Sequence, residues 1–206
     1  MDSNQLTNIL QGQLSDQMIG QLSQQLGGVD KEKTATAASG IVTTLMGALA
    51  RNASDPEGAQ SLNQALEQDH DGSILDDVVG MVTGSTQPQN SRMVNGGGIL
   101  KHVLGSKQSG AVDMISKMSG LDQNKTGSLM SMLAPLVMGA LGKTKKEQGL
   151  DIGGLTQILT GAVSQQKGDN PTMDLALRFL DSDGDGSVMD DVANIGMKML
   201  GGFFKK

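Results

Sequence analysis

The sequence contains no cysteine, tryptophan or tyrosine, and only three phenylalanines. Without cysteine the chain cannot form disulfide bonds, thiolate metal sites or a thiol nucleophile. Hydrophobic residues nevertheless make up 37% of the 206 residues, and 14 of them are methionines. Because the unbranched methionine side chain fills irregular gaps, we expect a core of aliphatic residues and methionine.

Long apolar runs are also missing from the sequence. No stretch approaches the roughly 20 apolar residues that a membrane-spanning helix needs. The first residues, MDSNQLTNILQGQL, lack a basic region followed by an apolar core, which is the pattern of a signal peptide. We therefore expect a cytoplasmic protein. Its net charge of −6 opposes binding to phosphate backbones over the surface as a whole.

Two segments with the pattern Met-Gly-Ala-Leu begin at Met46 and at Met138. The same spacing pairs Asp30 with Asp122, so the repeat has the size of a small domain. The apolar residues around both segments recur at helical spacing. The repeat predicts an all-α protein of two related small helical bundles, residues 1–83 and 98–167, joined by a linker at 84–97 and followed by a helical hairpin at 168–206.

Helix boundaries follow from capping residues. Leucines and Met18 recur every four residues over 6–26, which predicts one amphipathic helix that ends at Gly27-Gly28. Asp30 is a predicted N-cap for a helix over 31–52, and Asp55-Pro56 opens another. Pro135 lies inside the second copy of the long helix, where we expect a bend or a restart.

Two helical hairpins carry acidic turns. The first turn, Asp69-His70-Asp71-Gly72, precedes Ser73, which together with Asp76 forms a predicted capping box for a second helix. The second turn, DSDGDG, begins at Asp181 and is also followed by a serine, Ser187. Each hairpin is therefore predicted to place its carboxylates at the corner between two helices.

Several motifs resemble a known family. The run GGGILKHVLGSKQ from Gly96, the run LAPLVMGAL from Leu133, and the segments DPEGAQSL and DHDGSILDD resemble bacterial proteins that carry the domain of unknown function 937, related to the YidB-like proteins. The resemblance covers most of residues 40–160. It implies an all-helical fold, described as homeodomain-like for the YidB-like relatives, and it implies no activity and no catalytic residues.

The DSDGDGS segment is the strongest candidate for a metal site. Alternating carboxylates resemble the start of an EF-hand or dockerin loop, where they converge on Ca²⁺ around a glycine turn. The closing glutamate of such loops is replaced by Val192, so a shortened loop would have to be closed by a nearby aspartate. A turn followed by a capped helix is the alternative. The predicted calcium ligands are Asp181, Asp183, Asp185, Ser187, Asp190 and Asp191.

A second calcium site is predicted in the first acidic turn, where a turn and a helix cap explain most of the pattern. Glu67 stands where the other loop has aspartate, and its longer side chain is less usual at that position. His70 is expected to face solvent, whereas His102 is expected on a helix in an apolar setting. The residues of this second site are Glu67, Asp69, Asp71, Ser73, Asp76 and Asp77.

The sequence shows no Ser-His-Asp arrangement, phosphate loop or dinucleotide motif, so we expect no enzymatic activity. The favoured function is a binding or scaffolding module for an unidentified protein partner, with calcium as a structural ion. A nucleic-acid regulator with a helix-turn-helix is an alternative, although the chain has only three arginines. Self-assembly through Met, Gly and Ala faces is another. Phe203 and Phe204, beside Lys205 and Lys206, could also contact a membrane surface.

Overall fold

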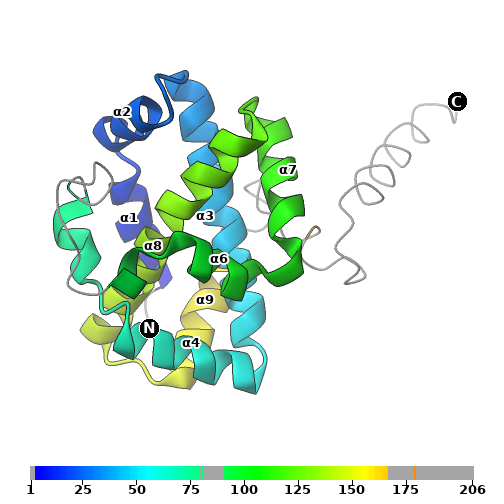
Figure 1. The fold of residues 1–206 in the computed structure, drawn as a ribbon. Helices are drawn as coiled ribbons and strands as arrows, with labels where there is room; N and C mark the ends of the chain where they lie inside the picture. The colour runs from blue at the N-terminus through cyan, green and yellow to red at the C-terminus, as the bar shows by residue number, and fades with distance from the viewer. Residues whose placement is uncertain (1–2, 79, 81–90, 167–178, 180–206) are drawn as a thin grey trace, which may run out of the picture.

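A computed structural model describes residues 3–78, 80, 91–166 and 179, and this part of the chain contains helices and no strand. The all-α prediction is therefore confirmed for these residues (Figure 1). None of the helices described here has the length and apolar character needed to cross a membrane. The elements are α1 (Ser3–Gln13), α2 (Asp16–Gln25), α3 (Lys31–Ala53), α4 (Pro56–Gln68), η1 (Ser73–Asp77), η2 (Ser91–Val94), α6 (Gly96–Leu104), η3 (Gly105–Lys107), α7 (Gln108–Ser119), α8 (Gln123–Gln148) and α9 (Ile152–Gln166).

The internal repeat is visible in how the two longest helices begin. The Asp30 carboxylate accepts a hydrogen bond from the third backbone N–H of α3, and the Asp122 carboxylate does the same at α8. In both helices a fully buried threonine, Thr34 or Thr126, donates to the backbone carbonyl of the capping aspartate at 2.9 Å. The predicted pairing of these residues therefore corresponds to the same local structure in both copies.

The connection that precedes each long helix is repeated as well. The Ser23 hydroxyl at the end of α2 donates to the carbonyl of Val29, and the Ser116 hydroxyl in α7 donates to the carbonyl of Leu121. Gly27 and Gly28 adopt positive φ after α2, as predicted for a helix end, and Gly120 does so after α7. Each copy thus contains a helical hairpin closed by a serine.

The first helical stretch differs from the prediction. Residues 6–26 form two helices, α1 and α2, rather than one. Ser15 is extended and its hydroxyl accepts a hydrogen bond from the N–H of Met18, so it caps α2. The four-residue spacing of leucines does not reveal this break because Leu10, Leu14 and Met18 keep the same spacing on both sides of it.

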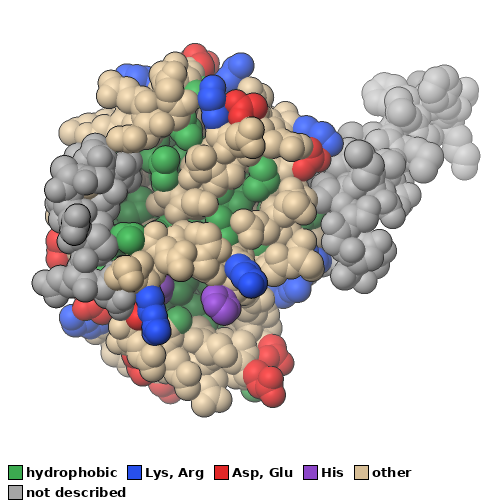
Figure 2. Space-filling model, viewed as in Figure 1, with side chains coloured by type: hydrophobic (Ala, Val, Ile, Leu, Met, Phe, Trp, Pro, Cys, Tyr) green, Lys and Arg blue, Asp and Glu red, His purple; other side chains and the backbone are tan. Residues whose placement is uncertain are grey.

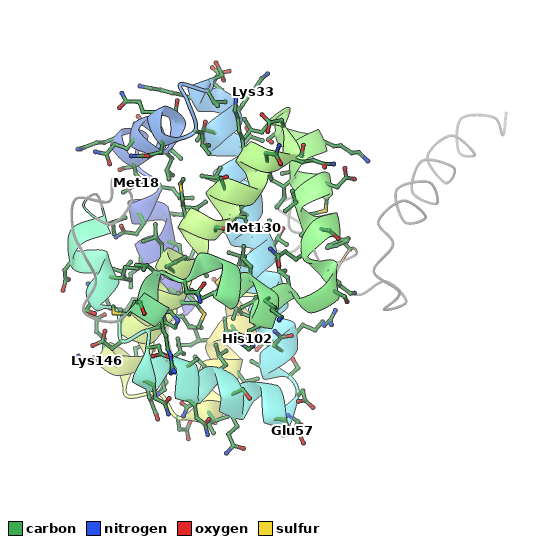
Figure 3. The ribbon with its side chains drawn as sticks, in the orientation of Figure 1. Met18, Lys33, Glu57, His102, Met130 and Lys146 are labelled. Atoms are coloured by element: carbon green, nitrogen blue, oxygen red, sulfur yellow. The ribbon has the colours of Figure 1, made fainter. Side chains whose placement is uncertain are left out.

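The core is one continuous cluster of buried apolar side chains from both copies of the repeat. α3 packs against α8, α9 and α7, while α1 packs mainly against α8 and α9, which belong to the other copy (Figure 1). Met130, which is fully buried, extends from α8 into this core (Figure 3). The two separate bundles expected from the sequence are therefore not shown, and the proposed domain boundaries stay a prediction.

Pro135 lies inside α8, which continues without interruption from Gln123 to Gln148. The predicted restart of the helix is thus absent. A proline has no N–H, so the carbonyl of Ser131 loses its intrahelical donor. Gly96 lies against this carbonyl so closely that a side-chain Cβ at Gly96 would come within 3.0 Å of it. The hydrogen that Gly96 has in place of a side chain points at the carbonyl oxygen, in the manner of a weak C–H···O contact.

Part of the predicted linker is helical. Residues 91–94 form η2, Met93 is buried, and α6 begins at Gly96, so the three glycines at 96–98 form its first turn. Residues 84–90 lie outside the described residues. The C-terminal hairpin does so as well, apart from Phe179, whose side chain is buried in the core cluster.

Candidate binding groove

A cavity of about 850 Å³ lies between α4 and α6. Figure 2 shows it as a hollow on the visible face, with apolar side chains at depth and a histidine and basic side chains along the edge. The floor consists of four apolar side chains, each at most 8% exposed, and one histidine. The floor residues are Leu49, Leu62, Ile99, Met138 and His70.

Capping residues fix the two helices that form the walls. Asp55 accepts a hydrogen bond from the N–H of Gly58 at 2.9 Å, and Pro56 occupies the first turn of α4, as predicted. Asn95 accepts from the N–H of Gly98 at 2.9 Å and begins α6. The Asn52 amide at the end of α3 donates to the carbonyl of Val103 at 3.0 Å. This bond holds the C-terminal end of α6 near the base of α4, so the groove has fixed walls.

The first acidic turn docks on the glycine face of α8. A Cβ at Gly142 would come within 3.0 Å of the His70 carbonyl oxygen, and a Cβ at Gly139 would come within 3.0 Å of the Ile74 side chain. Gly72 itself adopts a positive φ of 96° beside Lys143. Because these glycines permit close approach, the turn places His70 at the floor of the groove.

The carboxylates of this turn whose side chains are described do not converge on a common point. Asp71 accepts hydrogen bonds from the N–H and the hydroxyl of Ser73 at 3.0 and 2.7 Å. These bonds lower the pKa of Asp71. The predicted capping box is therefore wrong in detail, since Ser73 is the first residue of a 3₁₀-helix whose N-cap is Gly72.

The other acidic side chains of the turn have different partners. Glu67 pairs with Lys145 at 2.9 Å, and this hydrogen-bonded ion pair lowers the pKa of Glu67. Asp69 lies 3.9 Å from the guanidinium of Arg92. Asp76 is exposed, and the side chain of Asp77 is not described. In the described part of the chain no three side chains of the types His, Cys, Asp and Glu form a group that could hold a metal ion.

The hydrogen bonds and ion pairs of the principal predicted calcium loop are not described. Its ligands, Asp181, Asp183, Asp185, Ser187, Asp190 and Asp191, all lie outside the described residues.

The two histidines have environments opposite to those expected. His70 is only 5% exposed, whereas His102 is exposed at the edge of α6 that borders the groove (Figure 3). Burial lowers the pKa of His70, and the nearby Asp69 carboxylate opposes this shift. The lowered pKa favours the neutral form of the imidazole. Its Nδ1 atom is buried and has no hydrogen-bond partner among the described residues.

The rim of the groove carries charges of both signs. Arg51 and Arg92 are its cations, and Asp55 and Asp69 are its anions. The described lining includes no lysine and no cysteine. A mixed rim over an apolar floor is suited to an amphipathic ligand, because the apolar part is buried while polar groups stay at the edge.

Comparison with known families matches residues 8–144 to the family described as bacterial protein of unknown function (DUF937). The chain belongs to this family. Nothing among the curated proteins matches it, and nothing among the solved structures does. All residues that line the groove fall inside the segment matched to DUF937, whereas the Asp181–Asp191 loop follows that segment. The groove thus belongs to the part of the chain that the family shares.

Sequence reasoning missed the groove within the DUF937 segment. The residues that build it come from α3, α4, the acidic turn, α6 and α8, and only packing brings these elements together. One available signal was the glycine pair Gly139 and Gly142 on the long helix, which marks a face that another backbone can approach.

Proposed function

We propose that the protein is a non-enzymatic binding module that holds a segment of a partner protein in the groove between α4 and α6. The observation that carries the proposal is the groove itself, with its apolar floor, its polar rim and a volume of about 850 Å³. Clefts of roughly 300–1,000 Å³ with few polar groups are the usual small-ligand sites of proteins, so a cavity of this size can hold one or a few inserted side chains. A cleft between two helices also suits a partner that inserts apolar side chains.

The charges of the groove favour a protein partner over nucleic acid. Nucleic-acid interfaces use several cations along one face to contact phosphates. Here the two arginines of the rim are matched by two aspartates, and the whole chain has a net charge of −6. A polypeptide can present both signs of charge to such a rim, whereas a phosphate backbone cannot.

Site-specific crosslinking in the native bacterium tests the proposal. A photoreactive amino acid at Ser61, which is exposed and lines the groove, is compared with the same amino acid at Gln64. Gln64 is also exposed on α4 but does not line the groove. We expect a discrete crosslinked protein from Ser61 alone, and loss of this product when purified partner is mixed with a Ser61→Trp variant that fills the groove.

Other outcomes of this experiment would contradict the proposal. Equal products from both positions would show contact that does not depend on the groove. A crosslink to a second copy of this chain would indicate self-association, and light scattering would then give the size of the assembly. Binding to DNA or RNA with a steep salt dependence would favour the nucleic-acid alternative.

Calcium is a second part of the proposal and rests on sequence alone. The alternating carboxylates at Asp181, Asp183 and Asp185 support a site outside the groove, with Ca²⁺ stabilising the C-terminal hairpin. Calorimetric titration of the intact protein with CaCl₂ tests it against an Asp183→Ala, Asp185→Ala double variant. Equal heats from the two proteins would exclude calcium binding at these residues.

We also propose, from sequence motifs, which more distant proteins the chain is related to and how its repeat arose. The motifs at Gly96 and Leu133 support a link to the YidB-like proteins and a homeodomain-like arrangement of helices. The repeated helix caps support an origin by duplication of a helical unit, followed by an EF-hand-like hairpin. An experimental structure tests these relationships by superposition of residues 3–68 on residues 95–166.

A further inference from the structure

Helices run along both sides of the groove (Figure 1). Val103 near the end of α6 accepts a hydrogen bond from Asn52, which lies just before α4. Arg92, which precedes α6, lies 3.9 Å from Asp69 at the end of α4. The two helices therefore run in opposite directions. Since α4 has 13 residues, its side of the groove is about 20 Å long.

The side of α4 that faces the groove carries short side chains. Gly58, Ser61 and Ala65 line the groove and recur at helical spacing. Gly98 lines it from α6. The distance between packed helices depends on the side chains at their contact. Short side chains on both walls therefore let another helix lie close to α4 and α6, above the apolar floor.

Each end of the groove carries one cation and one anion. Arg51, in the last turn of α3, and Asp55, the N-cap of α4, lie at one end. Arg92 and Asp69 lie at the other. A helix has a positive N-terminus and a negative C-terminus. A helix along the groove would thus have an aspartate beside its first turn and an arginine beside its last turn, whichever way it runs.

Three other common modes of peptide recognition do not fit this lining. Addition of a strand needs an exposed sheet edge, and the part of the chain that the structure describes contains no strand. Proline-rich segments dock on aromatic side chains, and the described lining has no phenylalanine, tyrosine or tryptophan. Phosphorylated motifs need clustered arginines, whereas Arg51 and Arg92 lie at opposite ends of the groove.

We propose that the groove receives an amphipathic helix of a partner protein, about as long as α4, with its apolar face on the floor and its ends beside the two pairs of charges. This inference rests on the proposed function of the groove and specifies the structure of the bound segment. Such a helix presents apolar side chains at positions i, i+3 or i+4, and i+7.

The experiment selects phage-displayed random peptides of about 16 residues, which can form about four helical turns, on the full-length protein. Groove-dependent peptides are those that bind the native protein and Gln64→Trp but not Ser61→Trp, because Ser61 lines the groove and Gln64 does not. We expect these peptides to share apolar residues at helical spacing. On binding, the helical circular dichroism of the mixture should exceed the sum of the two components.

Proline substitutions in one selected peptide test the helix directly. A proline at the centre should weaken binding about 100-fold, because it removes a hydrogen bond and clashes within a helix. A proline in the first turn is the matched control and should have little effect. Both peptides are titrated into the unaltered protein, so this comparison does not depend on how well Ser61→Trp folds.

The possible results separate this inference from the proposed function. Groove-dependent peptides with alternating apolar residues, or equal binding of the two proline peptides, would refute the helix while leaving a groove that binds polypeptide. Absence of any groove-dependent peptide would contradict both proposals. Selected sequences that match a helix of this chain, together with a dimer in light scattering, would replace the partner protein by a second copy.

Discussion

Replacing Gly142 with alanine should detach the acidic turn from α8. The added Cβ would come within 3.0 Å of both the oxygen and the carbon of the His70 carbonyl, and backbone atoms cannot rotate away as a side chain can. The turn must therefore shift as a unit. It carries Ile74 and leads to Val78, which are 2% and 5% exposed.

The expected size of the effect follows from this burial. A buried isoleucine or valine contributes about 1.5–3 kcal/mol relative to exposure, so loss of both contacts costs about 3–6 kcal/mol. Alanine stabilises a helix by up to about 1 kcal/mol relative to glycine, which offsets part of this loss. We expect the free energy of unfolding to fall by about 2–5 kcal/mol in Gly142→Ala.

Gly127 provides a matched control on the same helix. A Cβ at Gly127 would meet nothing within 4 Å, so Gly127→Ala should raise the free energy of unfolding by about 0.5–1 kcal/mol. Urea denaturation followed by circular dichroism measures both variants, and hydrogen exchange at residues 70–78 shows whether the turn opens first. The reasoning is refuted if Gly142→Ala is as stable as Gly127→Ala and its turn stays protected.

Three further predictions concern the repeat, the proline and the buried histidine. Asp30→Ala and Asp122→Ala should each cost about 1 kcal/mol by loss of an N-cap, and in urea denaturation the double variant should show the sum of the two effects. Gly96→Ala should lower the midpoint of thermal unfolding, because its Cβ would collide with the Ser131 carbonyl, whereas Gly97→Ala, with open space around its Cβ, should not. Folding lowers the pKa of His70, so as the pH falls the unfolded chain takes up a proton at a higher pH than the folded chain does. The free energy of unfolding should therefore decrease as the pH drops below about 6.5. Urea denaturation at several pH values should show this loss in the native protein and not in His70→Phe, and equal pH profiles would contradict it.

The sequence contained enough information to predict the helices that begin at strong caps. Asp30, Asp55 and Asp122 each have a side chain that can accept from the first turn, and each cap is present. The repeat identified matching helix starts because short-range hydrogen bonds depend on nearby residues alone. The break at Ser15 was missed, since a serine between two leucines of the same apolar stripe suits both a continuous helix and a cap.

The site was less predictable than the helices. An acidic turn has the same composition whether it binds a cation or bonds its own backbone, and the first turn does the latter at Asp71. The burial of His70 depends on Gly142, which lies 72 positions further along the chain. Such a contact leaves no periodic pattern in the sequence, so exposure was assigned to the wrong histidine.

The position of α1 affects how the chain folds during synthesis. Leu6 and Leu10 are buried, and their helix packs on α8 and α9, which the ribosome makes more than 100 residues later. Until those helices emerge, the apolar side of α1 has no permanent cover. Completion of the native state therefore waits for translation of the second copy, and the nascent chain is a natural client for a chaperone that shields apolar helices.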